Sequence, residues 1–349
     1  MQAILVVTLP FFALILCGYL AAQRGLLAQA AIPGLNGFVL FFALPCLLFR
    51  FGLNTSLAVM LSPAVLAVYV PAALIMVALT IRLTRSERVP MKDAAFGALV
   101  AAFPNTGFMG VPLLVALLGA AAAGPVICTI LVDLLLTSSL CIALASGNTS
   151  GNISGKTNDK TDGHTVGQTV GHDAAPAAPQ TALLQALRGA LSNPLPWSIA
   201  LGLGVAGLGL SLPGPLMTVV NMLGDAASPV ALFTIGAVLW RAGQHAHSRT
   251  PVRLYLPVAL LKLLLHPSLV FGLGSLVQAL GAPLSGFQLT VLTLAAALPS
   301  ASNVSLLAER YGADNGRVAR IIMASTVLAF ASFSALAWWL MAAGQTAPV

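Results

Sequence analysis

The stretch Phe103-Pro104-Asn105-Thr106-Gly107-Phe108-Met109-Gly110-Val111-Pro112 decides the fold, because it interrupts an apolar segment that runs from about residue 94 to 118. Each of its two prolines removes an amide donor and collides with the carbonyl group four residues earlier. Backbone groups that such a break sets free cannot stay unsatisfied in hydrocarbon. We therefore expect this break to be buried in protein or to line a polar cavity.

A matching interruption, Leu298-Pro299-Ser300-Ala301-Ser302-Asn303, lies inside the apolar segment from about residue 287 to 308. Paired broken helices at corresponding positions in two halves of a chain indicate the binding site of a transporter. We place a candidate substrate site at the two breaks. Its expected members are Pro104, Asn105, Thr106, Gly107, Pro299, Ser300, Ser302 and Asn303.

The composition is that of a polytopic membrane protein. Of 349 residues, 58% are hydrophobic and 7% are charged, whereas a soluble domain carries about 25% charged residues. The net charge of +7 does not indicate nucleic-acid binding, because the basic residues follow membrane topology. The first apolar run has no Lys or Arg before it and no A-x-A site beside it, so we expect a retained membrane span.

Spans of about 20 apolar residues fit the chain ten times. Their approximate limits are 2–22, 32–53, 57–81, 94–118, 121–146, 194–212, 214–240, 254–280, 286–308 and 318–343. Fourteen of the 16 Lys and Arg residues fall in alternate loops, beginning with the loop between spans 1 and 2. The positive-inside rule places these five loops in the cytoplasm and both termini on the periplasmic side. Glycines at 202, 204, 207 and 209 predict close packing of span 6.

Residues 147–180 are rich in Gly, Thr, Asn, Asp and Ala-Pro, which predicts a disordered cytoplasmic linker. This linker separates a first five-span repeat, residues 1–146, from a second, residues 181–349. Because five is odd, the second unit enters the membrane in the opposite sense, and the two form an inverted repeat. Short stretches of similar sequence at corresponding positions in the two halves support the repeat. Ala-Ala-Phe-Pro at 101–104 resembles Ala-Ala-Leu-Pro at 296–299, and Leu-Pro-Cys-Leu-Leu-Phe at 44–49 resembles Ser-Pro-Val-Ala-Leu-Phe at 228–233.

These residues resemble the auxin efflux carrier family, which includes plant auxin carriers and bacterial malonate and malate permease-like members. The pattern Pro104-Asn105-Thr106-x-x-Met109-Gly110-Val111-Pro112-Leu113-Leu114 is similar to the family's span-4 signature. Asn193-Pro194, Asp225-Ala226-Ala227 and Ala297-Leu298-Pro299 fit further positions.

The resemblance implies an all-α polytopic membrane protein with ten transmembrane helices. They would form two inverted five-helix repeats, in which the broken helices 4 and 9 cross near mid-membrane. Sodium/proton antiporters and bile-acid symporters share this fold. The resemblance also implies a scaffold domain and a transport domain that move in an elevator-like way, and a homodimer.

Two departures from the plant carriers narrow the expected substrate. Plant members have Gln at the position that matches Asp133, and they carry an Asp/Lys support site in span 3. Here span 3, residues 57–81, contains no charged residue. Plant-type auxin specificity is therefore not implied, and a bacterial carrier of small organic anions is the favoured interpretation.

A broken helix exposes amide donors at the start of its second half, where the helix dipole also favours anions. The amides near Thr106 and Gly107, with the Asn105 side chain, would attract a carboxylate, and the polar residues of the second break would act similarly. Family resemblance assigns carboxylate hydrogen bonding to Asn105 and Asn193, and a place on the substrate path to Leu44. The alternative is that the polar groups at the breaks only cap the broken backbone.

Ionisable groups inside a membrane are functional candidates, because each is costly to bury. Asp133 lies about 18 Å into span 5 at about 1.5 Å per residue, near the midplane. It is the expected coupling group for a proton or sodium ion. The alternative is a structural carboxyl held by the hydroxyl groups of Thr129 or Thr137.

Two further charges, Asp225 and Lys262, also fall near mid-depth in their spans. We hypothesise that they pair with each other, because two opposite charges in a membrane are cheaper together than apart. Such a pair would be structural or part of transport. His266 is either a proton site or a hydrogen-bonded structural histidine.

The predicted function is a secondary active transporter, a permease or efflux carrier, that moves a small organic carboxylate across the bacterial inner membrane by elevator-type alternating access. The sequence has no nucleotide-binding loop and no nucleophile–base or metal motif. We therefore expect no enzymatic activity, no cofactor, no metal site and no nucleic-acid partner. The alternative is a sodium-coupled bile-acid-like symporter or a sodium/proton antiporter of the same architecture.

Overall fold

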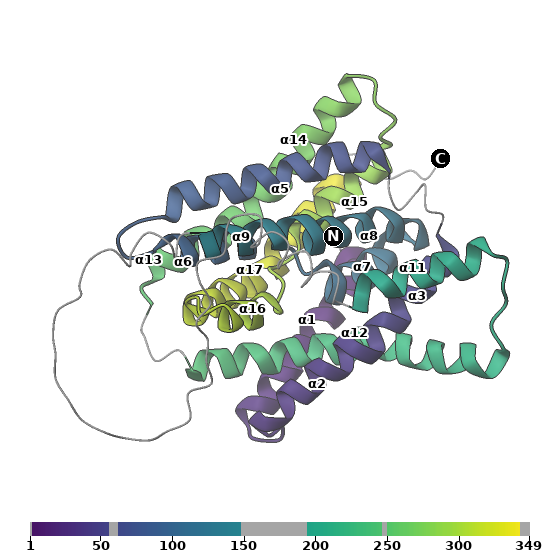
Figure 1. The fold of residues 1–349 in the computed structure, drawn as a ribbon, viewed down its shortest axis with the longest axis horizontal. Helices are drawn as coiled ribbons and strands as arrows, with labels where there is room; N and C mark the ends of the chain where they lie inside the picture. The colour runs from purple at the N-terminus through teal and green to yellow at the C-terminus, as the bar shows by residue number, and fades with distance from the viewer. Residues whose placement is uncertain (1, 56–61, 148–193, 246–249, 343–349) are drawn as a thin grey trace, which may run out of the picture.

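The computed structural model describes residues 2–55, 62–147, 194–245 and 250–342, and these residues are almost entirely helical (Figure 1). Seven helical stretches among them are long and apolar enough to cross a membrane, and three shorter apolar helices accompany them. The described residues contain no strand, only two isolated bridges, Ser86 with Val89 and Pro104 with Ser300. The prediction of an all-helical, multi-pass membrane protein is confirmed.

Each helix of the first half overlaps an apolar segment that the sequence predicts, with ends that differ from the predicted limits by up to several residues. The helices are α1 (Gln2–Gln23), α2 (Ile32–Phe38), α3 (Leu44–Asn54), α5 (Pro63–Thr84), α6 (Met91–Ala102), α7 (Val111–Leu118), α8 (Ala123–Val132) and α9 (Ser138–Gly147). Single 3₁₀ turns precede α2 (Gln29–Ala31) and α8 (Ala120–Ala122), and π-helical turns precede α3 (Val39–Ala43), α7 (Thr106–Gly110) and α9 (Asp133–Thr137).

The second half begins after residues 148–193, so nearly all of the predicted linker lies outside the described residues. Its helices are α11 (Pro194–Gly207), α12 (Gly214–His245), α13 (Val252–Leu260), α14 (His266–Ala279), α15 (Gly286–Ala297), α16 (Val304–Arg310) and α17 (Asn315–Ala342), with a π-helical turn at Leu261–Leu265. Helix α11 ends five residues before the predicted limit of 212, because Gly209 takes a left-handed φ of 64° and Pro213 follows.

Proline accounts for three of the four π-helical turns. Those turns end one or two residues before Pro45, Pro112 and Pro267. A proline supplies no N–H group and its ring clashes with the carbonyl four residues earlier, so a locally wider turn relieves the conflict without ending the helix. The long spans thus bend at defined points.

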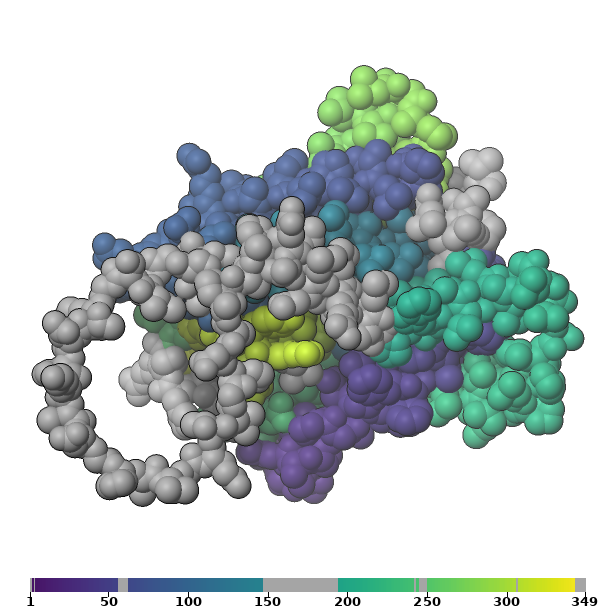
Figure 2. Space-filling view, in the orientation of Figure 1, coloured from purple at the N-terminus to yellow at the C-terminus, as the bar shows by residue number. Residues whose placement is uncertain are grey.

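The helices pack in two groups. One contains α1, α2, α3, α11 and α12, which lie across the lower part and the right of Figure 1, and the other contains α5, α6, α8, α9, α13, α14 and α15. Helix α17 contacts members of both groups. Figure 2 shows the same division at the surface, with the purple and teal segments below the blue and green ones.

Glycine permits two close helix crossings in the first group, α1 with α12 and α3 with α11. A Cβ atom on Gly236 would lie 1.9 Å from the carbonyl oxygen of Ile15, and one on Gly202 would lie 2.3 Å from that of Phe49. The backbones are therefore in direct contact, as in other membrane helix pairs with small residues. The predicted role in close packing is confirmed for Gly202 but wrong for Gly204, Gly207 and Gly209, where a Cβ would meet nothing within 4 Å.

We predict that Gly202→Ala destabilises the protein by about 1–3 kcal/mol, the usual cost of overpacking a close contact. The added methyl group would collide with the Phe49 carbonyl and with Gly52 of the facing helix. Gly204→Ala is the matched control on the same helix and should leave stability unchanged or slightly raised. Thermal unfolding in detergent measures both, and equal unfolding midpoints would contradict the assigned crossing.

Candidate functional site

The two interruptions lie against each other, each between the halves of a broken helix. The Asn105 N–H donates to the Pro299 carbonyl at 2.8 Å, and the Ala301 N–H donates to the Phe103 carbonyl at 3.0 Å. This short antiparallel bridge satisfies backbone groups that the missing helical turns set free. Asn105 is 3% exposed and Ser300 is 1% exposed, so the prediction that the break is buried in protein is confirmed.

A cavity of about 30 Å³ lies beside this bridge. A cavity of that size has room for no more than a few water molecules, so it is too small for any organic anion in this conformation. Both helix groups contribute to its wall. The lining residues are Leu40, Leu44, Phe103, Pro104, Asn105, Thr106, Gly107, Phe108, Ile130, Leu134, Leu195, Ala301 and Asn303.

The structure therefore brings six of the sequence-predicted site residues to one cavity. These are Leu44, Pro104, Asn105, Thr106, Gly107 and Asn303. Pro299, Ser300 and Ser302 belong to the same break but do not line the cavity. Asn193 lies outside the described residues, two positions before the lining residue Leu195.

Asn105 holds the break together through its backbone rather than through its side chain. Its carbonyl oxygen accepts hydrogen bonds from Met109 N–H at 3.1 Å and from Gly110 N–H at 2.9 Å, while its own N–H binds Pro299. Among the described residues, the side-chain amide of Asn105 has no hydrogen-bond partner and does not cap the following helical turn. The side-chain amide at the cavity wall is therefore not used by the fold and is available for hydrogen bonding.

The second break leaves two buried polar atoms without a partner among the described residues, Asn303 Oδ1 and Ser300 Oγ. The Ser300 N–H donates to the Ser325 hydroxyl at 3.2 Å. The two orientations of an amide side chain differ only in which atom is called oxygen and which nitrogen. A rotated Asn303 amide would present donors to the cavity, opposite the donors of Asn105.

Asp133 is fully buried at the start of the π-helical turn before α9. Its carboxylate accepts hydrogen bonds from the Tyr69 hydroxyl at 2.9 Å and the Thr137 hydroxyl at 3.2 Å. Of the two hydroxyl partners expected from the sequence, Thr137 is confirmed. Thr129 is not a partner, because its hydroxyl donates to the Val126 carbonyl at 2.7 Å.

Lys262 is also fully buried. Its ammonium group donates to the Ala296 carbonyl at 2.7 Å and lies 2.9 Å from His266 Nδ1. Ala296 is in the last turn of α15, so the positive charge lies at the negative end of that half-helix. Lys262 thus stabilises the helix end that the second break leaves open.

These side chains form one intramembrane polar cluster, defined as Tyr69, Asp133, Thr137, Lys262 and His266. The Tyr69 and His266 rings lie 5.9 Å apart. The charges of Asp133 and Lys262 influence each other electrostatically, although no direct ion pair joins these two described residues. The cluster is next to the break cavity, since Ile130 and Leu134 line the cavity on either side of Asp133.

Comparison with known proteins identifies the family. Residues 3–338 match the model of a family described as "Membrane transport protein". The chain belongs to this family. It is the auxin efflux carrier family that the span-4 motif resembles, so that prediction is confirmed, as is the prediction of a transport protein rather than an enzyme.

One relative of this membrane transport protein comes from Rhizobium meliloti (strain 1021) and is described as "Putative malonate transporter". The two sequences are 28% identical over 334 residues, which cover 94% of this chain and 93% of the relative. The aligned region is therefore long enough to span both broken helices and the intramembrane polar cluster.

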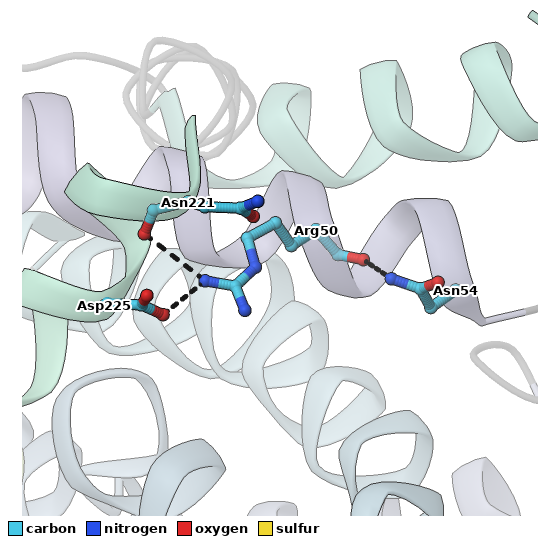
Figure 3. Close-up of polar contacts among 4 residues, drawn as sticks. All are labelled: Arg50, Asn54, Asn221 and Asp225. Atoms are coloured by element: carbon cyan, nitrogen blue, oxygen red, sulfur yellow. Dashed lines mark hydrogen bonds and ion pairs between the residues drawn. The ribbon is translucent and has the colours of Figure 1, made fainter. Parts of the chain in front are cut away.

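The predicted pairing of Asp225 with Lys262 is wrong. Asp225 on α12 forms an ion pair with Arg50 on α3, with 2.6 Å between Asp225 Oδ1 and Arg50 Nη1, and the same nitrogen lies 3.5 Å from the Asn221 carbonyl (Figure 3). Depth estimates from the sequence place charges at similar heights but do not say which helices are neighbours. Here α12 packs on α3, whereas Lys262 faces α15.

A signal for Arg50 was present in the sequence. It is the one basic residue outside the five basic loops other than Lys262, and an unpartnered charge within a span requires a counter-charge.

We predict that Arg50→Asp and Asp225→Arg each lower the unfolding temperature, because each puts two like charges together between α3 and α12. The double variant R50D/D225R should recover most of the loss, as expected for a directly coupled pair. The double variant D225K/K262D should not recover, since Lys262 is bound elsewhere. Thermal unfolding of the four variants measures this, and recovery only in the second combination would overturn the assigned pair.

Proposed function

We propose that this protein is a secondary active transporter that carries a small organic carboxylate, with malonate the first substrate to test. The observation that carries the proposal is the Asn105 side-chain amide, which faces the cavity and is not used by the fold. The description of the Rhizobium meliloti relative supports the substrate class.

Recognition of the anion would depend on amides and helix ends. No charged side chain is among the residues lining the cavity. Gly107 and Phe108 are in the first turn of a half-helix, where N–H groups have no intrahelical acceptor and the dipole favours negative charge. Together with the side chains of Asn105 and Asn303, they would surround a carboxylate with donors.

Alternating access requires this small cavity to enlarge and to open to each side of the membrane in turn. Leu44 and Leu195 contribute to its wall from the group that contains α3 and α11, whereas Asn105 and Ile130 contribute from the other group. A displacement of one group against the other would therefore change the cavity directly. We propose an elevator-type motion, with the glycine-packed helices as the scaffold and the helices around the two breaks as the transport domain.

The glycine crossings support an inverted repeat. Both use the same pair of motifs, Ile-x-x-Gly on one helix and Phe-x-x-Gly on its partner, with the halves of the chain exchanged. The first crossing joins Ile15 and Gly18 to Phe233 and Gly236, and the second joins Ile199 and Gly202 to Phe49 and Gly52. We propose ten spans in two inverted units, residues 1–146 and 181–349.

The arrangement in the membrane follows from the basic loops. We propose the bacterial inner membrane, with both termini periplasmic and residues 147–180 as a cytoplasmic linker. A homodimer is proposed from the family resemblance alone.

We further propose that the intramembrane polar cluster couples transport to an ion. Asp133 is a buried carboxyl beside the cavity and could take up a proton or sodium ion, and Lys262 provides a fixed counter-charge at the end of α15. The same carboxyl favours the second candidate function, a sodium-coupled bile-acid-like symporter or a sodium/proton antiporter.

We predict that Asn105→Ala reduces malonate uptake into proteoliposomes by at least about tenfold, because one hydrogen bond to a charged group is worth about 1.5–3 kcal/mol. The variant should fold normally, since only backbone atoms of Asn105 hold the break. Asn54→Ala is a matched control, because that side chain only donates to the Arg50 carbonyl on α3. Unchanged uptake by folded Asn105→Ala would reject the assigned substrate site.

We predict that Asp133→Asn retains malonate counterflow but loses accumulation driven by an imposed proton or sodium gradient. Removal of the charge leaves the cavity wall intact, because Asp133 does not line it. Thr129→Val, which removes a buried hydroxyl group that donates to the Val126 carbonyl and not to the carboxylate, is the control and should retain driven accumulation. Driven accumulation in Asp133→Asn would exclude this coupling site, and sodium or proton exchange by the wild type without any carboxylate would favour the antiporter.

A further inference from the structure

A separate cleft of about 600 Å³ lies between the end of α5 and the start of α13, and shares no lining residue with the break cavity. Its walls are mainly leucines of α13 and of the π-helical turn that follows, whereas one end is polar and carries Arg253 and Arg317. Leu83 and Leu264 on its wall are 60% and 57% exposed. The cleft therefore opens at the outer surface of the helices, where the surroundings are lipid chains.

Arg317 gives the polar end a buried positive charge. The residue is 2% exposed, its Nε donates to the Leu254 carbonyl at 2.9 Å, and its Nη1 donates to the Asp93 carbonyl at 2.9 Å. Nη2 is buried beside Gly97 of α6 and has no hydrogen-bond partner among the described residues. Arg317 therefore contributes its positive charge, rather than a free hydrogen-bond donor, to the cleft that it lines.

The nearby carboxylates form no direct ion pair with the Arg317 guanidinium among the described residues. The Asp93 carboxylate accepts from the Asp314 N–H at 2.8 Å, and the Asp314 carboxylate accepts from the Arg317 N–H at 2.9 Å. Both carboxylates are thus engaged with backbone donors at the start of α17. Arg253 is exposed and has no direct partner among the described residues, so it provides an available guanidinium group at the mouth of the cleft.

The ligand must match two guanidinium groups at one end and an apolar groove along the rest. Guanidinium groups bind phosphate oxygens in bidentate geometry, and the leucine wall suits a hydrocarbon chain. Basic pockets between transmembrane helices on the cytoplasmic side bind the head groups of anionic lipids, and both helix ends here adjoin basic loops in the sequence.

We propose that this cleft binds one anionic phospholipid of the surrounding bilayer, with its phosphate against Arg253, near the positive charge of Arg317, and an acyl chain along α13. Arg317 also joins the starts of α6, α13 and α17 through its other donors. A bound lipid would hold this junction together, because a ligand that binds only the folded state stabilises it. The proposal does not depend on the identity of the transported substrate.

The test is a lipid titration of the purified full-length protein in neutral detergent, with native mass spectrometry for the apparent Kd and thermal unfolding for stabilisation. The lipids are phosphatidylglycerol and phosphatidylcholine. Glycerophosphoglycerol and inorganic phosphate test whether the phosphate suffices without acyl chains. The variant is Arg253→Ala, since an exposed side chain is removed without disturbing the fold. Arg24→Ala, another exposed basic residue that does not line the cleft, is its matched control.

We expect phosphatidylglycerol to bind more tightly than phosphatidylcholine and to raise the unfolding temperature of the wild type and Arg24→Ala. Arg253→Ala should weaken phosphatidylglycerol binding by about fivefold, the usual effect of one basic residue near an anionic head group. Equal binding by Arg253→Ala and Arg24→Ala would overturn the proposal. So would stabilisation by glycerophosphoglycerol or phosphate alone, which would assign the site to a soluble anion.

Discussion

The structure depends on the need to pair every backbone polar group inside the bilayer. Each unsatisfied N–H or carbonyl group in hydrocarbon costs several kcal/mol. The two breaks free such groups in the middle of two helices, and the Phe103–Asn105 and Pro299–Ala301 segments pair them with one another. The same contact fixes α6 and α7 against α15 and α16. It also brings the amides of Asn105 and Asn303 to one cavity. The backbone hydrogen bonds that satisfy the two breaks therefore also position the polar side chains of the candidate site.

The cost of burying a charged group in the membrane explains, in a related way, which partners the intramembrane charges have. Asp133 is buried with hydroxyl donors from Tyr69 and Thr137, and Lys262 is buried against the carbonyl end of α15. Arg50 and Asp225 instead neutralise each other directly across α3 and α12. Asp133 and Lys262 thus have mainly neutral hydrogen-bond partners, whereas Arg50 and Asp225 form a direct ion pair. This difference in partners is the reason why Asp133, rather than Asp225, is proposed as the coupling group.

The two helix groups differ in how they are held. Glycine brings α1 against α12 and α3 against α11 at backbone contact, which leaves little room for rearrangement. The cavity, in contrast, is lined by residues from both groups, among them Leu44, Leu195 and Asn105. Side-chain contacts across an interface can slide, whereas interlocked backbones cannot. This contrast is consistent with the proposed motion of one group against the other.

The sequence by itself determined the apolar helices, the two breaks, their burial and the family, because hydropathy, proline chemistry and a local motif act within a single segment. It also predicted six of the residues at the break cavity. The tertiary structure alone decided that Asp225 meets Arg50 rather than Lys262, that Gly202 but not Gly204 lies at a crossing, and that Arg317 faces a cleft. These facts depend on which helices are neighbours and on how each is rotated, and neither is set by the local pattern of a helix that is apolar on nearly every face.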